Sequence, residues 1–120
     1  MRTCVEKEVL ATALAVAQAA TVYSTALKTP HQLGFMSLLI VTTAGSITVT
    51  QQVSMDGTTF YDAVDSDGNA LGAVVAAMTV GTKYIQFSPV LAPHIRFKIV
   101  EGNSAPTAVS LNLAHLKDER

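Results

Sequence analysis

The chain is poor in charge, contains no tryptophan and has a single cysteine, Cys4. Charged side chains make up 14% of its 120 residues, against about a quarter in ordinary soluble domains. Its 8 Lys and Arg balance 9 Asp and Glu without forming a basic cluster, so the counterion release that drives nucleic-acid binding has little to act on. We therefore expect no nucleic-acid partner, and we expect part of this weakly charged surface to be covered by another molecule.

A lone cysteine excludes an intramolecular disulfide, and the position of Cys4 near the terminus argues against a catalytic thiol. The segment VLATALAVAQAA is similar to the apolar part of a signal peptide, but Glu6 and Glu8 dilute the positive charge expected before it. We expect this segment to be retained in the mature protein. Residues 9–27 carry no charge, yet they contain too many Thr, Ser, Gln and Tyr side chains for a transmembrane helix, so no membrane span is predicted.

Beyond residue 20 the chain consists of short runs of β-branched and aromatic residues, separated by Gly, Pro, Asn and Asp. Apolar and polar residues alternate in SITVTQQV, HIRFKIV and AVSLNLAH, as in antiparallel strands with one face in water. About eight strands fit the length of the chain. The sequence predicts an all-β fold, an antiparallel β-sandwich that is jelly-roll-like. Besides the three alternating runs, strands are expected over residues 22–27, 35–43, 60–64, 71–78 and 83–88.

The first twenty residues fit two structures. Their alanine content favours a helix, whereas large apolar residues at even positions favour a strand. The β-rich sequence that follows favours an extended arm or edge strand, so we divide the chain into an N-terminal segment, 1–20, and a β-sandwich domain, 21–120. Because residues 9–20 are apolar without an amphipathic period, we expect them to anchor the protein to a partner. The candidate contact residues are Val9, Leu10, Leu14 and Val16.

An Asp-Gly pair, Asp56-Gly57, stands between the strand-like QVS and FYDA. Asp-Gly is a strong hairpin signal, because glycine accepts a positive φ without steric cost. We interpret it as a corner rather than a binding site. Thr58 and Thr59 are expected to begin the return strand, and one of the two following aromatic residues is expected to face the core.

The sequence offers weak candidates for a metal site. Clustered oxygen ligands in DAVDSDGNA, namely Asp62, Asp65, Asp67 and Asn69, are compatible with calcium, but the loop lacks the terminal bidentate Glu and is also ordinary turn chemistry. The histidines lie far apart and lack zinc-ligand spacing, so we interpret them as surface or interface residues. No nucleophile elbow or phosphate-binding loop is present. We expect no metal, no cofactor and no enzymatic activity. The histidines are His31, His94 and His115.

The stretch VSMDGTTFYDA, followed by KYIQFSPVLAPHIRFKIVEGNSAPTAVSLNLA, resembles β-sandwich proteins of tailed-bacteriophage virions. In those proteins a Val-Ser-x-Asp-Gly hairpin with an aromatic residue precedes a Tyr-Ile-x-Phe strand and an Ile-Arg-Phe strand. The chain looks like the small jelly-roll decoration or cement proteins of phage capsids. The Ala-rich first twenty residues depart from that pattern.

This resemblance implies a virion structural protein, made in the host cytoplasm, that binds the major capsid protein on the outer capsid surface and stabilises the capsid. Because 49% of this short chain is hydrophobic, its apolar surface exceeds what a small core hides, so we expect a homo-oligomer and favour a trimer. A tail or head-fibre component and a carbohydrate-binding module are the alternatives. Sugar binding is disfavoured by the low aromatic content, 6%, and by four phenylalanines expected in the core, Phe35, Phe60, Phe87 and Phe97.

Overall fold

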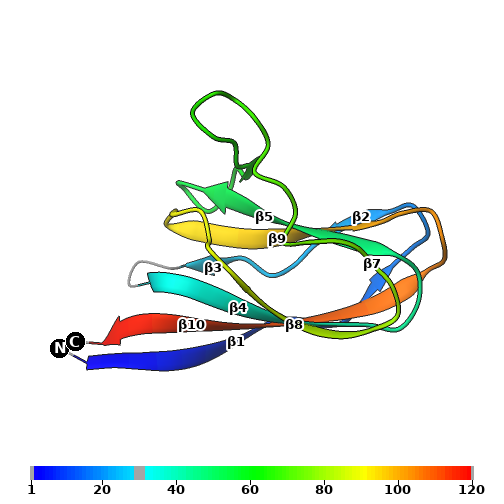
Figure 1. The fold of residues 1–120 in the computed structure, drawn as a ribbon, viewed down its shortest axis with the longest axis horizontal. Helices are drawn as coiled ribbons and strands as arrows, with labels where there is room; N and C mark the ends of the chain where they lie inside the picture. Colours follow the sequence, from blue (N-terminus) through cyan, green and yellow to red (C-terminus); the bar gives the residue numbers. More distant parts are fainter. Residues whose placement is uncertain (1, 29–31, 120) are drawn as a thin grey trace.

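The protein is an all-β sandwich of two antiparallel sheets, seen as two layers in Figure 1. The structure, a computed structural model, describes the backbone of residues 2–28 and 32–119, and side chains over 5–28 and 35–116. Within these ranges there is no helix, and therefore none that is long and apolar enough to cross a membrane. The all-β antiparallel sandwich predicted from residue alternation is confirmed.

Ten strands build the two sheets. Sheet A has the order β1-β10-β4-β8, and sheet B has the order β2-β9-β5-β6, with β3 also paired to β9 and β7 to β5. Because β2 and β3 share one partner, and β6 and β7 share another, each pair forms one interrupted strand. Counted in this way each sheet holds four strands, in the jelly-roll arrangement predicted. The bounds are β1 (Arg2–Val16), β2 (Thr21–Tyr23), β3 (Leu27–Lys28), β4 (Gln32–Thr42), β5 (Ile47–Ser54), β6 (Tyr61–Asp62), β7 (Val75–Met78), β8 (Gly81–Phe87), β9 (His94–Glu101) and β10 (Thr107–Glu119).

The N-terminal segment forms β1, the edge strand of sheet A, paired with β10 along its length. The register shifts by one residue after Val9 and again between Ala11 and Leu14. At this bulge Ala13 has φ 45, and its N–H donates to Ser110 Oγ at 3.0 Å. The two one-residue shifts add up to two residues, an even number, so Leu14 and Val16 after the bulge lie on the same core side as Leu10 before it. The edge-strand alternative is therefore confirmed over the helical one, because packing overrides alanine's helix propensity.

The core lies between the sheets and consists of the inward residues of alternating strands. Residues 94–101 of β9 alternate half-buried and buried without a break, as predicted. The rings of Phe87 and Phe97 pack edge to face, with centroids 5.9 Å apart. The expectation that all four phenylalanines lie in the core is wrong for two of them: Phe35 is exposed on the outside of β4, and Phe60 lies against Arg96. Both residues follow turn or bulge positions, where strict alternation fails.

Glu101, at the end of β9, is the most connected side chain of the fold and is only 2% exposed. Its carboxylate accepts hydrogen bonds from the backbone N–H of Ala19, Ser46 and Ser104, each at 3.0 Å at its closest. These three donors belong to three different loops, so one carboxylate joins the connections β1–β2, β4–β5 and β9–β10. The N–H of Ala19, followed by those of Ser46 and Ser104, lowers the pKa of Glu101 from 4.5 to about 2.

The fit around this carboxylate is tight. Gly45 has φ +70, and a Cβ placed on it would lie 2.7 Å from the Ala105 carbonyl oxygen and 2.9 Å from Glu101 Oε2. Glycine is therefore required here both for the left-handed backbone and for the close approach of the carboxylate. Gly72 has a similar φ, +84, but nothing lies within 4 Å of its Cβ position.

We predict that Glu101→Gln lowers the melting temperature by roughly 10 °C at pH 7, because an amide NH₂ would face backbone donors and leave them unpaired. The folded-state pKa is depressed, so the stabilisation is present above pH 4.5 and is lost as the pH falls toward 2. Melting curves across this window should show the wild type approaching the variant as the pH falls.

A steric probe of the same site is Gly45→Ala, with Gly72→Ala as its matched control. Both substitutions strain a left-handed backbone, so only the difference between them reports the clash with the carboxylate. We expect Gly45→Ala to have the lower melting temperature. Equal melting temperatures for the two variants, or a Glu101→Gln protein with the wild-type pH profile, would contradict the role assigned to Glu101.

Candidate functional site

The Asp56-Gly57 pair forms a corner, as interpreted from the sequence. Asp56 Oδ1 accepts the N–H of Thr58 at 2.9 Å and of Thr59 at 3.0 Å, while Ser54 Oγ accepts the N–H of Gly57 at 2.8 Å. The bond from Thr59, followed by that from Thr58, lowers the pKa of Asp56 to about 2. Oδ1 of the carboxylate is thus used by its own turn.

The path after the corner differs from the prediction. Thr58 and Thr59 lie in the turn, and the return strand begins at Tyr61, which is exposed. The expectation that either Phe60 or Tyr61 faces the core is therefore wrong. The turn is longer than a two-residue hairpin because Asp56 caps the two threonine amides, which delays the start of pairing.

The acidic loop is organised by its own backbone. Asp65 Oδ1 accepts the N–H groups of Asp67 and Asn69, both at 2.9 Å, and the bond from Asn69 is the main cause of the lowered pKa of Asp65. Asp62 is held elsewhere, by Lys98 Nζ at 2.7 Å and Gln52 Nε2 at 2.8 Å. The carboxylates of Asp62 and Asp65 therefore point to different partners, and the absence of a calcium site stays a prediction.

A polar and aromatic network covers the outer face of sheet B. Arg96 on β9 lies between two rings, with its guanidinium carbon 4.0 Å from the centroid of Tyr23 and 4.1 Å from that of Phe60. Its Nε donates to Gln52 Oε1 at 2.8 Å. Through Gln52 the network continues to Asp62 and Lys98, where the ion pair, with hydrogen bonding to Lys98 first, lowers the pKa of Asp62.

Sequence reasoning placed the members of this network on strands but missed the network itself. The alternation in SITVTQQV and HIRFKIV marks Gln52, Arg96 and Lys98 as outward-facing. Nothing in that alternation says that β5 and β9 are neighbours, with Gln52 opposite Arg96. The aromatic partner Phe60 was assigned to the core because it adjoins a strand-like run.

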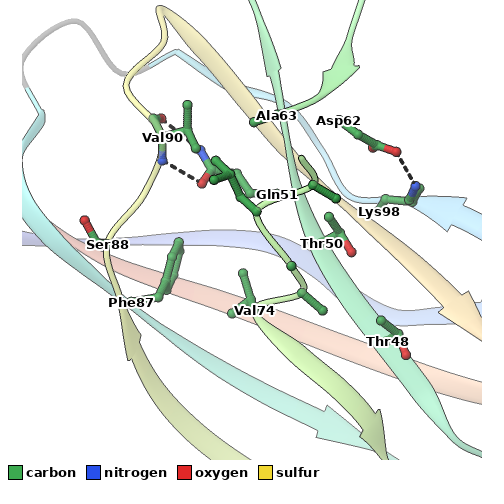
Figure 2. A pocket seen from close by; sticks show the side chains of 14 residues that line it. Thr48, Thr50, Gln51, Asp62, Ala63, Val74, Phe87, Ser88, Val90 and Lys98 are labelled. Carbon is green, nitrogen blue, oxygen red and sulfur yellow. Dashed lines mark hydrogen bonds and ion pairs between the residues drawn. The ribbon is translucent and has the colours of Figure 1, made fainter. Parts of the chain in front are cut away.

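Beside this network runs a groove of about 600 Å³, shown in Figure 2. Thr48 and Thr50 of β5 line it together with the Asp62–Lys98 ion pair, and Phe87 and Val74 supply apolar walls. Gln51 closes one side, because its amide donates to the Val90 carbonyl at 3.0 Å and accepts the Val90 N–H at 2.9 Å. The groove combines apolar walls with a few fixed polar groups.

The outer face of sheet A has a different chemistry. The cross-strand row through its middle is Val9, Asn112, Leu39 and Tyr84, on β1, β10, β4 and β8. Val9 and Tyr84 are exposed, and Leu39 is half-buried. Three residues of this row, Asn112, Leu39 and Tyr84, border a shallow depression of about 250 Å³. We call this surface the A face; its exposed or half-buried apolar residues include Val5, Val9, Phe35, Leu39, Val41, Tyr84 and Leu116.

The four residues proposed for partner contact lie on both sides of β1. Leu10 and Val16 are buried in the chain's own core, and Leu14 packs against it. Val9 is 54% exposed and belongs to the A face. Partner contact by this segment stays a prediction, and in this fold Val9 is the residue that presents its side chain for it.

The histidines do not share one environment. His94 is half-buried and packs against Gly57, since a Cβ on that glycine would lie 3.1 Å from the His94 ring. His31 lies outside the described residues. His115 is 6% exposed and faces inward from β10. The expectation that all three are surface or interface residues is therefore wrong for His115. A histidine is usually assigned to the surface because it is polar, so its inward-facing position on β10 was not recognised.

The strand order places the chain among jelly-roll β-sandwiches. Among solved structures it is similar to infectious bursal disease virus of the Gt strain, with TM-score 0.57, 15% identity, and coverage of 97% of this chain and 33% of that one. The VP2 subviral particle of that virus matches with TM-score 0.53 and 15% identity, over 97% of this chain and 33% of that one. The Gx strain of the virus matches with TM-score 0.52 and 15% identity, over 98% of this chain and 32% of that one.

These likenesses concern the fold. The chain spans about a third of the length of the virus-particle chains that it matches. No protein-family model matches the chain, and no curated protein sequence matches it. The neighbours are proteins of virus particles with an all-β fold, whereas the resemblance to tailed phages is a matter of residue pattern alone.

We predict that Arg96→Lys lowers the free energy of unfolding by about 1 kcal/mol, because an ammonium group cannot stack between two rings and bond to Gln52 in the same geometry. The matched control is Lys98→Arg, which keeps a surface ion pair with Asp62 and should cost less than about 0.5 kcal/mol. Urea unfolding measures both. Equal losses for the two exchanges would contradict the role given to the stacked guanidinium.

Proposed function

We propose that the chain is a non-enzymatic structural protein of a virion, a decoration or cement protein that binds the outer capsid surface and stabilises it. The observation that carries this proposal is the A face, an apolar sheet surface on a jelly-roll fold of the kind found in virus particles. The phage setting, the virion location and synthesis in the host cytoplasm belong to the same proposal.

The A face has the size and composition of a binding surface. Four strands about 4.8 Å apart, averaging about 39 Å in length, present roughly 700 Å², close to the area per partner of a standard protein interface. Along the central row Val9, Leu39 and Tyr84 are apolar or aromatic, and Lys7 is the charged residue that borders the depression. Depletion of charge with retention of Tyr is typical of interface centres.

The outer faces of the two sheets would have different roles. The outer face of sheet B carries Arg96, Lys98 and Asp62 and is suited to water. The A face is suited to the major capsid protein or to further copies of this chain. Many copies binding a repeated lattice gain avidity, so modest affinity per copy is sufficient.

A carbohydrate-binding module is the second candidate, and the groove beside the Asp62–Lys98 ion pair favours it. The groove offers hydroxyls from Thr48 and Thr50 together with an ion pair, which match sugar hydroxyls. Binding on a glycan array, lost in Lys98→Ala, would support this candidate. A tail or head-fibre component would use the same A face, and electron microscopy of the source particle distinguishes it from a capsid protein by position.

We predict that the purified protein is a homo-oligomer, with a trimer favoured, because the exposed apolar residues of the A face are costly to leave in water. Multi-angle light scattering at micromolar concentration should give a multiple of the 12.6 kDa chain mass, three for the trimer. A uniform 12.6 kDa species would contradict this prediction.

We predict that Tyr84→Lys weakens co-sedimentation with undecorated, expanded capsids of the source virus at least tenfold, because it places a charge in the central row of the A face, at its β8 end. The matched control is Tyr61→Lys, a tyrosine of sheet B with nearly the same exposure, 62% against 67%. The control should bind like the wild type. Weakening by Tyr61→Lys alone would move the binding surface to sheet B, and a wild type that binds no capsid would refute the proposed function.

A test of the N-terminal segment uses the same assay. Deleting residues 1–20 removes an edge strand and two core residues, Leu10 and Val16, so loss of binding by that truncation would also report unfolding. Val9→Asp changes the outward side alone and leaves the core side chains in place, so it is the sharper variant for the anchoring role.

A further inference from the structure

Three chemically reactive side chains meet on the inner side of the β1–β10 pair. Glu6 and Glu8 are two residues apart on β1 and therefore share a face, and Glu6 lies opposite His115 on β10. One ligand atom from each of the three residues lies within 4.8 Å of the others. Glu8 adjoins Val9 in the middle row of sheet A, and Glu6 and His115 lie closer to the strand ends that carry the chain termini, at the left of Figure 1.

The histidine is the unusual member. His115 is 94% buried, and neither of its ring nitrogens has a hydrogen-bond partner among the described residues. Its Nε2 points to the cluster and lies 3.7 Å from Glu8 Oε1, which is too far for a hydrogen bond. A buried imidazole without a partner loses its hydrogen bonds to water and gains none in the protein, which costs free energy. Such a residue therefore requires an explanation.

Edge protection explains the acids but not the histidine. Inward-pointing charges on an edge strand hinder pairing with another chain, and Lys83 on the opposite edge strand β8 has such a position, opposite Ile40. Glu6 and Glu8 serve β1 in the same way. A buried imidazole is not needed for that purpose, because an apolar residue at position 115 would pack equally well.

We propose that Glu6, Glu8 and His115 form a binding site for a divalent transition-metal ion, with zinc as the ion that fits best. Imidazole and carboxylate are both ligand types that such ions accept, and imidazole distinguishes them from calcium and magnesium, which prefer oxygen. Around a tetrahedral zinc ion, ligand atoms lie roughly 3.3 Å apart, given bonds of about 2.0 Å. The present separations, up to 4.8 Å, close to that value by rotation of the two flexible Glu side chains.

The site has both an entry path and a structural consequence. Glu8 is 36% exposed at its side chain, so an ion reaches the cluster from solvent past this residue. Ligands on β1 and β10 would be joined by the ion, which fastens the edge strand to its neighbour between the start of β1 and its bulge. The proposal departs from the sequence-based expectation of no metal site, and it holds whether or not the protein binds a capsid.

The first test is thermal melting of the untagged, metal-free full-length protein, with Cys4→Ser in every variant so that a thiol cannot bind the ion. With zinc chloride at a hundredfold excess over its dissociation constant, we expect the melting temperature to rise by about 10 °C. Glu8→Gln, at a partly exposed position, and His115→Gln should each lose most of this rise. The matched control His94→Gln should keep it.

Cobalt provides a second readout that does not depend on stability. Visible d–d absorption of the Co²⁺-loaded protein should appear with the wild type and vanish with Glu8→Gln, even if His115→Gln fails to fold. Zinc titration calorimetry on the same proteins should show a stoichiometry of one, with affinity at least tenfold weaker in Glu8→Gln. Three results would overturn the proposal: no response to zinc, an equal response in wild type and Glu8→Gln, or a response to calcium alone.

Discussion

The jelly roll depends on one buried carboxylate. Strand pairing satisfies the backbone hydrogen bonds within each sheet. Three connections at one end of the sandwich, however, contain N–H groups that have no carbonyl acceptor on a neighbouring strand. Glu101 accepts from Ala19, Ser46 and Ser104, which belong to these three connections. The backbone adapts to it, since Ala19 adopts φ 60 and Gly45 leaves out the side chain that would collide with it. Three connections that cross between the two sheets are thereby held in one relative position.

The sequence could predict the sheets but not the contacts between them. Period-two alternation sufficed for β5, β9 and β10, because one face of each strand is wet. The alternation could not reveal that Glu101 is buried, because a charged residue at the end of a strand is normally interpreted as the start of an exposed loop. The same limit applies to Arg96 between two rings and to His115 beside Glu8, since the partners lie at least 36 residues away in sequence and meet only through the strand order.

Local turn chemistry was predictable where the turn satisfies itself. Asp56 caps its own corner and Asp65 its own loop, with bonds spanning no more than four residues. The same reasoning failed for the aromatic residues after the corner, because Arg96 draws Phe60 to the outer face of sheet B. A side chain's neighbours in space decide such cases, so composition and spacing are reliable for turns and much less so for surfaces.

Two places in the sandwich show how the surroundings of a carboxylate determine its use. At the end with Glu101, loops present backbone N–H groups, and the carboxylate takes its hydrogen bonds from them. Nearer the middle of sheet A, Glu6 and Glu8 project from a stretch of the edge strand β1 that pairs with β10 without a break, so the neighbouring backbone of β10 already donates within the ladder. The two carboxylates there lie beside each other and beside the His115 imidazole. The imidazole of His115, buried beside them, is a ligand rather than a sufficient counter-charge, because it is a cation only when protonated.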